Sequence, residues 1–190
     1  MLLEWDSVEV ALERLGGVLE ERGLAFEIVV IGGSALLLLN LIRRPTRDLD
    51  VLALVREGRY VSADPLPDGL RQAAVDVART LGLADNWLNS GPTGQLKTGL
   101  PEGFERRVET RTYRTLVVHI ASRFDQIHLK LYAAADYWPY EQRHVDDLRR
   151  LAPTRAELDQ ATEWALGQEA NPAFRQQVDA VVEALGADGG

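Results

Sequence analysis

Two aspartates separated by one residue are the side chains in this sequence that most directly suggest catalysis. Asp48 and Asp50 stand in TRDLDVLALV at 46–55, where polar and apolar residues alternate before a wholly apolar run, a pattern that predicts a strand with one solvated end. Side chains two residues apart on a strand project from one face, roughly 7 Å apart at the backbone, whereas Leu49 points into the core. Such carboxylates repel each other unless a cation binds both, and hard oxygen ligands favour Mg²⁺. The alternative is an edge strand with two solvated acids.

A glycine-rich turn precedes these acids. The β-branched apolar run FEIVVI at 26–31 is followed by Gly32, Gly33 and Ser34. This pattern predicts a buried strand entering a tight turn, with Ser34 as the N-cap of a short apolar helix. Backbone N–H groups at the turn and the positive end of a helix suit the phosphates of a nucleotide, and glycine permits a close approach. A tight turn that binds nothing is the alternative.

The two motifs lie on consecutive predicted elements joined by one short helix, so two adjacent strands would present the turn and the acids at the same end. Gly33-Ser34 followed by Asp48-Leu49-Asp50 resembles the signature of the DNA polymerase β-like nucleotidyltransferase superfamily. More narrowly, GGSALLLL followed by RPTRDLDVL is similar to the branch that contains abortive-infection and toxin-antitoxin nucleotidyltransferases and their uncharacterised relatives. The resemblance implies an α/β (α+β) fold, with a small mixed nucleotidyltransferase-type sheet flanked by helices and a C-terminal helical half.

The resemblance extends into the second half of the chain. IHLKL at 127–131 and RHVDDL at 143–148 resemble that branch's pattern of a helix lysine followed by an arginine and an Asp-Leu pair. It implies that Lys130 contacts the triphosphate and that Asp147 has the later acidic, catalytic role, with Asp146 as the alternative register. From the residues alone, a lysine that covers apolar surface and a helix that pairs its own charges explain the same pattern.

Arginines flank the acids at Arg43, Arg44 and Arg47. The guanidinium fork suits phosphate, and we assign Arg47 to the nucleotide site together with the glycine turn. A basic loop that merely offsets the charges of Asp48 and Asp50 is the alternative.

A third metal carboxylate is missing from the strand where the resemblance implies one. Many members of the superfamily carry it on a later strand, but the later strand predicted here, RTLVVHI at 114–120, offers only His119. Asp147 supplies the third oxygen ligand, or the site works with two acids, or catalysis has been lost. Histidine is a poor Mg²⁺ ligand, so we expect His119 in the core or at its rim.

The elements that must position these residues follow from hydrophobic spacing and turn residues. They are helices at 7–22 and 69–81, a loop at 86–103, a strand at 114–120, a helix capped by Ser122, a helix at 141–151, and helices opened by the Thr154/Glu157 capping box and by Asn171-Pro172. We therefore expect a nucleotidyltransferase-like core at 1–121 and a helical region at 122–187 that completes the nucleotide site, together one compact unit.

Composition limits the other functions. The 190 residues include no cysteine, which excludes disulfides and thiolate metal sites, and a net charge of −8 argues against a protein that coats nucleic acid. The longest apolar stretch, at 35–42, is too short to span a bilayer, and we expect a mature cytoplasmic protein. For Trp87 and for Tyr137, Trp138 and Tyr140 we favour hydrophobic packing over base stacking.

Together these features predict a Mg²⁺-dependent nucleotidyltransferase, with Mn²⁺ as the alternative metal. It would move a nucleoside monophosphate from ATP or another NTP to a hydroxyl acceptor. The resemblance implies three acceptor classes, namely RNA such as a tRNA 3′ end, a protein, or a small molecule such as an antibiotic, and it offers the toxin of a toxin-antitoxin system as one role, with a cognate antitoxin as the partner. Two rivals remain: a catalytically inactive module that binds a nucleotide or a protein, and a structural protein whose Asp48 and Asp50 are solvated surface acids.

Overall fold

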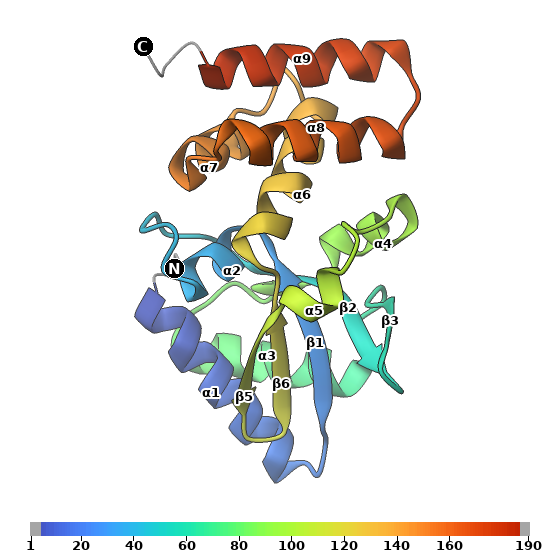
Figure 1. Cartoon of the computed structure of the whole chain (residues 1–190). Coiled ribbons are helices and arrows are strands. Elements are labelled where there is room, and N and C mark those ends of the chain that lie inside the picture. The colour runs from blue at the N-terminus through green and yellow to red at the C-terminus, as the bar shows by residue number, and fades with distance from the viewer. Residues whose placement is uncertain (1–4, 187–190) are drawn as a thin grey trace. The chain divides into compact units, whose positions relative to one another are not determined.

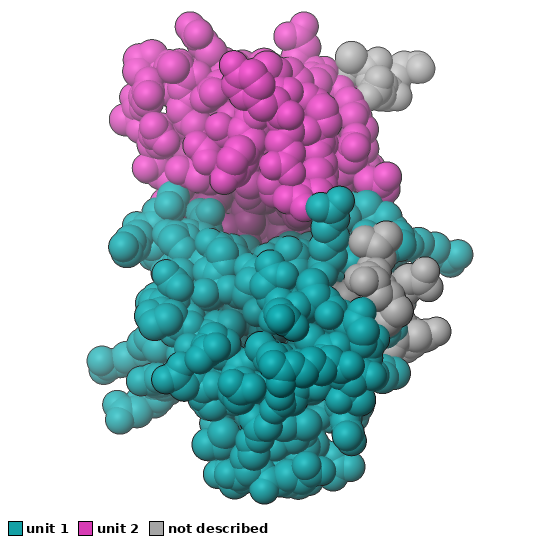
Figure 2. Space-filling model, turned by 180° about the vertical axis from the view of Figure 1, so that it is seen from behind, with its two compact units in different colours: residues 1–122 teal, residues 123–190 magenta. Residues whose placement is uncertain are grey.

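The computed structural model describes residues 5–186, with side chains described from residue 7 onward, and it has a mixed α/β architecture (Figure 1). Contacts between residues cluster into two units, one ending at Ser122 and one beginning at Arg123 (Figure 2). The sequence predicts a boundary after residue 121, within one compact unit. Within residues 5–186, no helix is both long enough and apolar enough to cross a membrane.

The first unit is built on a mixed sheet with the strand order β3-β2-β1-β6-β5, in which β4 pairs with β2 beside this path. Strand β1 runs parallel to β6 and antiparallel to β2. The elements are α1 (Trp5–Glu21), β1 (Phe26–Ile31), α2 (Gly32–Leu38), β2 (Leu49–Arg56), β3 (Arg59–Ser62), α3 (Asp68–Leu81), β4 (Leu88–Asn89), η1 (Gly91–Gly94), α4 (Gln95–Thr98), α5 (Phe104–Arg107), β5 (Glu109–Tyr113) and β6 (Leu116–Ile120). The predicted small mixed sheet is confirmed.

Helix α1 packs closely on this sheet. It contacts α3 as well as β5 and β6 (Figure 1). Its apolar face, with Val8, Leu12, Leu15 and Leu19, is fully buried, as the helical spacing predicted. At Gly16, a Cβ atom would overlap the carbonyl oxygen of Tyr113, so the missing side chain lets the helix axis approach the backbone of β5.

Two features around α2 differ from those predicted from the sequence. Ser34 is not the N-cap: that position belongs to Ile31, and Ser34 is the third residue of the helix. Strand β2 begins at Leu49, three residues later than predicted, so Asp48 precedes the strand. The reason is local, because the carbonyl oxygen of Asp48 accepts hydrogen bonds from the hydroxyls of Ser34 and Thr46 in place of strand pairing.

Three short strands were also missed. Strand β3 forms a hairpin with β2 through Glu57 and Gly58, both at positive φ. Strand β5 forms a hairpin with β6. Arg114, which the sequence placed at the start of the strand now seen as β6, instead occupies the turn of this hairpin with a φ of 56°. Strand β4 lies inside the predicted loop.

The second unit consists of α6 (Arg123–Asp136), α7 (Arg143–Leu151), α8 (Arg155–Gln168) and α9 (Pro172–Gly186). Helix α6 contacts the other three helices. The predicted capping box is confirmed, since Thr154 accepts from the backbone of Glu157 and Glu157 accepts from the backbone of Thr154. The cap at Asn171 is confirmed as well, because its Oδ1 accepts from the Ala173 N–H at 2.9 Å.

The aromatic side chains divide into packed and exposed ones. Trp87 is fully buried and donates its indole N–H to the carbonyl oxygen of Ala74 at 2.9 Å, which confirms packing. For Tyr140 the packing prediction was wrong, since this side chain is 94% exposed. Tyr137 is 52% exposed but stacks on His144 with ring centroids 6.0 Å apart, and Trp138 is partly buried. Tyr137, Trp138 and Tyr140 lie in the segment between the end of α6 at Asp136 and the start of α7 at Arg143.

We predict that Gly16→Ala destabilises the first unit. The added methyl group must displace the backbone of Tyr113, an overpacking that costs about 1–3 kcal/mol in the free energy of unfolding. Gly17→Ala is the matched control, because its Cβ would meet Arg114 at an ordinary 3.8 Å. This variant should gain helix propensity of about 1 kcal/mol. Urea denaturation of both variants measures the difference, and equal midpoints would contradict the tight α1–β5 contact.

We also predict that the charge on Glu157 stabilises the second unit only above acidic pH. The hydrogen bond from Arg123, followed by the backbone bond from Thr154, lowers the pKa of Glu157 from 4.5 to about 2. A depressed pKa contributes stability above pH 4.5, and this contribution is lost as the pH falls from 4.5 to about 2. Glu157→Gln keeps the capping oxygen but removes the charge. The stability difference from wild type, measured by denaturation between pH 7 and pH 2, should therefore shrink towards zero; a constant difference would argue against the ion pair.

Candidate functional site

The end of β1 meets the start of β2. In this antiparallel pair Ile31 lies opposite Asp50. A register shift between Val29 and Val30 moves the pairing by one residue, from Val29 opposite Ala53 to Val30 opposite Val51. This bulge sets Asp50, rather than Val51, beside the residue that enters the glycine turn.

Gly32 is required at this turn for two reasons. Its φ is +80°, in the left-handed region that residues with side chains rarely adopt. In addition, a Cβ atom at Gly32 would lie 2.5 Å from Oδ2 of Asp50. The carboxylate of Asp50 therefore lies directly against the backbone of the turn.

The next glycine is surrounded by side chains from the segment before β2. A Cβ atom at Gly33 would lie 3.0 Å from Oγ1 of Thr46 and 3.6 Å from Nη2 of Arg44. Arg44 thus brings a guanidinium group to the turn, while Arg47, the arginine assigned to the nucleotide site from the sequence, is exposed. Sequence spacing alone did not distinguish among the three arginines.

Ser34 and Asp48 are brought together through the backbone. The buried hydroxyl of Ser34 donates to the carbonyl oxygen of Asp48, and Thr46 Oγ1 donates to the same oxygen at 3.4 Å. The side chain of Leu49 is fully buried, as predicted, whereas Asp48 and Asp50 are partly exposed. The pattern of burial is thus the predicted one, with a buried leucine between two partly exposed acids.

Asn89 is a site residue that the sequence analysis missed. It pairs in register with Asp50 between β4 and β2, and its Nδ2 donates to Oδ1 of Asp50 at 3.2 Å. The residue lies in a stretch whose Gly, Pro, Asn and Thr content predicted a loop, so no local signal identified it.

Asp48 and Asp50 fit a Mg²⁺ ion by donor chemistry, because Mg²⁺ is commonly held by one or two carboxylates together with water and substrate phosphates. Within the described residues no group of three or more His, Cys, Asp or Glu side chains is arranged to hold a metal. His119 lies at the rim, as expected, with Nε2 2.5 Å from Oε1 of Glu27 and Nδ1 2.8 Å from Oγ1 of Thr110.

The two residues predicted in the helical half contact each other inside the second unit. Lys130 Nζ donates to Oδ2 of Asp147 at 2.7 Å, and the side chains are 8% and 0% exposed. Arg150 lies 3.9 Å from the other carboxylate oxygen. Asp146, the alternative register, forms a surface ion pair with Arg149 at 3.0 Å. The buried acid of α7 is therefore Asp147, and its charge is balanced by Lys130.

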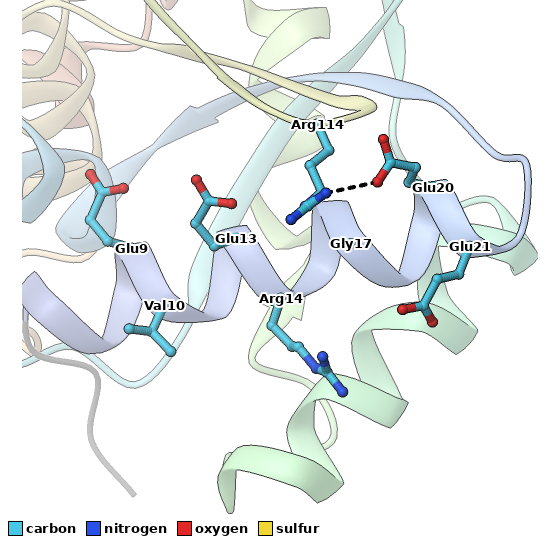
Figure 3. Close-up of a pocket in the computed structure, with 8 residues that line it drawn as sticks. All are labelled: Glu9, Val10, Glu13, Arg14, Gly17, Glu20, Glu21 and Arg114. Atoms are coloured by element: carbon cyan, nitrogen blue, oxygen red, sulfur yellow. Dashed lines mark hydrogen bonds and ion pairs between the residues drawn. The ribbon is translucent and has the colours of Figure 1, made fainter.

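A hollow of about 500 Å³ lies elsewhere on the first unit, along the outer face of α1 (Figure 3). It is lined by Glu9, Val10, Glu13, Arg14, Gly17, Glu20, Glu21 and Arg114. Arg114, which pairs with Glu20 at 2.9 Å, follows Tyr113 in the β5–β6 turn beside the Phe26 end of β1. The glycine turn follows the opposite end of that strand. None of the predicted site residues lines the hollow.

Comparison of the chain with protein-family models, with curated proteins and with solved structures found no match. What the site can do is therefore argued from its own residues: the glycine turn, the acids Asp48 and Asp50, and the guanidinium of Arg44 beside Gly33.

We predict that Lys130→Met destabilises the second unit. The substitution leaves the buried carboxylate of Asp147 without its 2.7 Å partner, which costs about 3–5 kcal/mol of unfolding free energy. Replacing both residues, with Lys130→Met and Asp147→Leu, should restore most of the loss. Arg149→Met, which breaks the exposed pair with Asp146, is the matched control and should cost about 1 kcal/mol or less.

Denaturant unfolding checks the stability order of these variants. Calorimetric titration of folded Lys130→Met with NTP and NMP tests the nucleotide role in parallel. A loss of NTP affinity alone, without a change in stability, would contradict the structural role of this pair.

Proposed function

We propose that this chain is a Mg²⁺-dependent nucleotidyltransferase that moves a nucleoside monophosphate from an NTP to a hydroxyl acceptor. One observation carries the proposal: the Asp50 carboxylate lies against the Gly32 backbone, 2.5 Å from the position of a Cβ atom. A ligand at this turn would meet a carboxylate and a glycine backbone without side chains at once. A metal-bound phosphate matches this combination, because the cation joins two groups that otherwise repel.

The neighbouring residues support a phosphate ligand. Arg44 lies beside Gly33, and a guanidinium fork can donate two hydrogen bonds to phosphate oxygens. The Ser34 and Thr46 hydroxyls donate to the Asp48 carbonyl, which fixes the backbone at the first of the two acids. Backbone contacts of this kind support the proposal, because a preorganised site loses less entropy when its ligand binds.

Asp48 and Asp50 would hold the cation, which when bound would polarise the α-phosphate and stabilise charge on the attacking and leaving oxygens. In the reaction, a bond forms between the acceptor oxygen and the α-phosphorus. The bond from that phosphorus to the bridging oxygen breaks, and pyrophosphate leaves with the bond's electron pair. The acceptor proton passes to a carboxylate or to water. The chain's share is positioning and charge stabilisation, with no covalent enzyme intermediate.

Lys130 and Asp147 belong to the proposal only through the resemblance. Their contact with each other supports a role in holding the helical unit together. Arg44 joins Arg47 as a proposed phosphate contact, because its guanidinium lies beside the turn.

The acceptor class proposed is an RNA 3′ end or a protein hydroxyl, as in a toxin acting in the cytoplasm with a cognate antitoxin. A net charge of −8 favours an acceptor bound at a local patch over extended binding of RNA. The second candidate is a nucleotide-binding module without turnover. It is favoured by β6, the later strand, whose residues Leu116–Ile120 include no Asp or Glu that could serve as a third metal carboxylate.

We predict that Asp48→Asn and Asp50→Asn each reduce transfer by about 100-fold or more, because each removes a ligand of a cation worth several kcal/mol in the transition state. The assay incubates the protein with each α-labelled NTP, Mg²⁺ and a cell extract, and measures which macromolecule becomes labelled. Asp85→Asn, at an exposed acid of the same unit, is the matched control and should retain full activity.

The outcomes separate the candidates. Wild-type transfer that survives both substitutions would remove the metal assignment. Binding of Mg²⁺-NTP without any transfer would favour the binding module, and no binding at millimolar NTP would leave Asp48 and Asp50 as surface acids.

A further inference from the structure

We propose that Asn89 is a positioning residue that holds Asp50 in the orientation needed to bind the divalent cation. This inference rests on the proposed function, because it assigns a role at the same metal site. It begins from the pairing of β4 with β2, which places Leu88 opposite Leu49 and Asn89 opposite Asp50. Asn89, which follows Asp50 by 39 positions in the sequence, is thereby held beside the Asp50 carboxylate.

The orientation of the Asn89 amide is fixed by two hydrogen bonds. Its Oδ1 accepts from the backbone N–H of Gly91 at 2.8 Å. Because the carbonyl oxygen faces that N–H group, the NH₂ group faces Asp50, and Nδ2 donates to Oδ1 at 3.2 Å. The amide therefore acts on Asp50 as a donor.

The two oxygens of Asp50 consequently have different surroundings. Oδ1 receives the Asn89 hydrogen bond, while Oδ2 is the atom nearest to the position of a Cβ on Gly32. Fixing Oδ1 fixes the rotation of the carboxylate plane, and this directs Oδ2 towards the glycine turn. Outer hydrogen bonds of this kind orient metal-binding carboxylates in proteins.

The strand that carries Asn89 is itself firmly anchored. The N–H of Leu49 donates to the carbonyl oxygen of Trp87 at 2.5 Å, and the Trp87 ring is fully buried and bonded to Ala74. Asn89 follows two residues later. Its position relative to Asp50 is thus set by strand pairing and by a core tryptophan.

A neutral amide suits this role better than a third acid would. It orients Asp50 without adding a like charge to the Asp48/Asp50 pair, so the repulsion in the absence of a cation is not increased. Its own oxygen is engaged with Gly91, which distinguishes a positioning residue from a ligand.

The test measures binding of Mn²⁺ alone to the full chain by electron paramagnetic resonance of the free ion. We expect Asn89→Ala to weaken Mn²⁺ affinity by about 10- to 100-fold, the usual effect of losing an outer hydrogen bond to a metal ligand. Asn86→Ala, at an exposed position of the same connecting segment, is the matched control and should bind as wild type does. Hydrogen exchange of the Leu49 amide reports in parallel whether β4 still pairs with β2.

Weaker binding with unchanged Leu49 protection supports the positioning role. Equal affinity of Asn89→Ala and wild type overturns it, and so does a loss of affinity accompanied by loss of Leu49 protection, because Asn89 would then only stabilise β4. Wild-type protein that binds no Mn²⁺ would instead refute the metal site itself. Binding that Asp50→Asn abolishes and Asn89→Ala leaves intact would refute this inference alone.

Discussion

The antiparallel pairing that sets Ile31 opposite Asp50 is the constraint on which the candidate site depends. The strand bulge selects Asp50 for this place, and the pairing brings its carboxylate against Gly32, where any side chain would collide with it. Gly32 must also adopt a φ of +80° for the chain to leave β1 and enter α2. One backbone arrangement therefore fixes both the identity of the glycine and the position of the acid.

Elements whose signals are local could be predicted from the sequence. The apolar run of β1, the spacing of α3 and the Thr154/Glu157 capping box depend on residues within a few positions of one another, and all three occur in the structure. Strands β3, β4 and β5 are short and owe their existence to the partner strand. Propensity within such segments does not identify them, because pairing with a distant strand decides the conformation.

The same distinction applies to the site. The glycine pair and the Asp48/Asp50 spacing are local, so the sequence could nominate them. Asn89 is bonded to a residue 39 positions away, and Arg44 differs from its arginine neighbours only in where the folded loop directs it. Neither the Asn89–Asp50 bond nor the position of Arg44 can be predicted from the spacing of residues in the sequence. The contact of Lys130 with Asp147 likewise depends on how α6 and α7 pack.

Asp147 and Asp50 differ in burial and in the hydrogen-bond donor that lies beside each carboxylate. Asp147 is fully buried and bonded to the ammonium group of Lys130, which cancels its charge as burial requires. Asp50 is partly exposed and receives a hydrogen bond from the amide of Asn89. A neutral amide orients a carboxylate without adding a positive charge of its own. The lysine bond holds two packed helices together, whereas the amide bond supports the orientation that the proposed metal site requires.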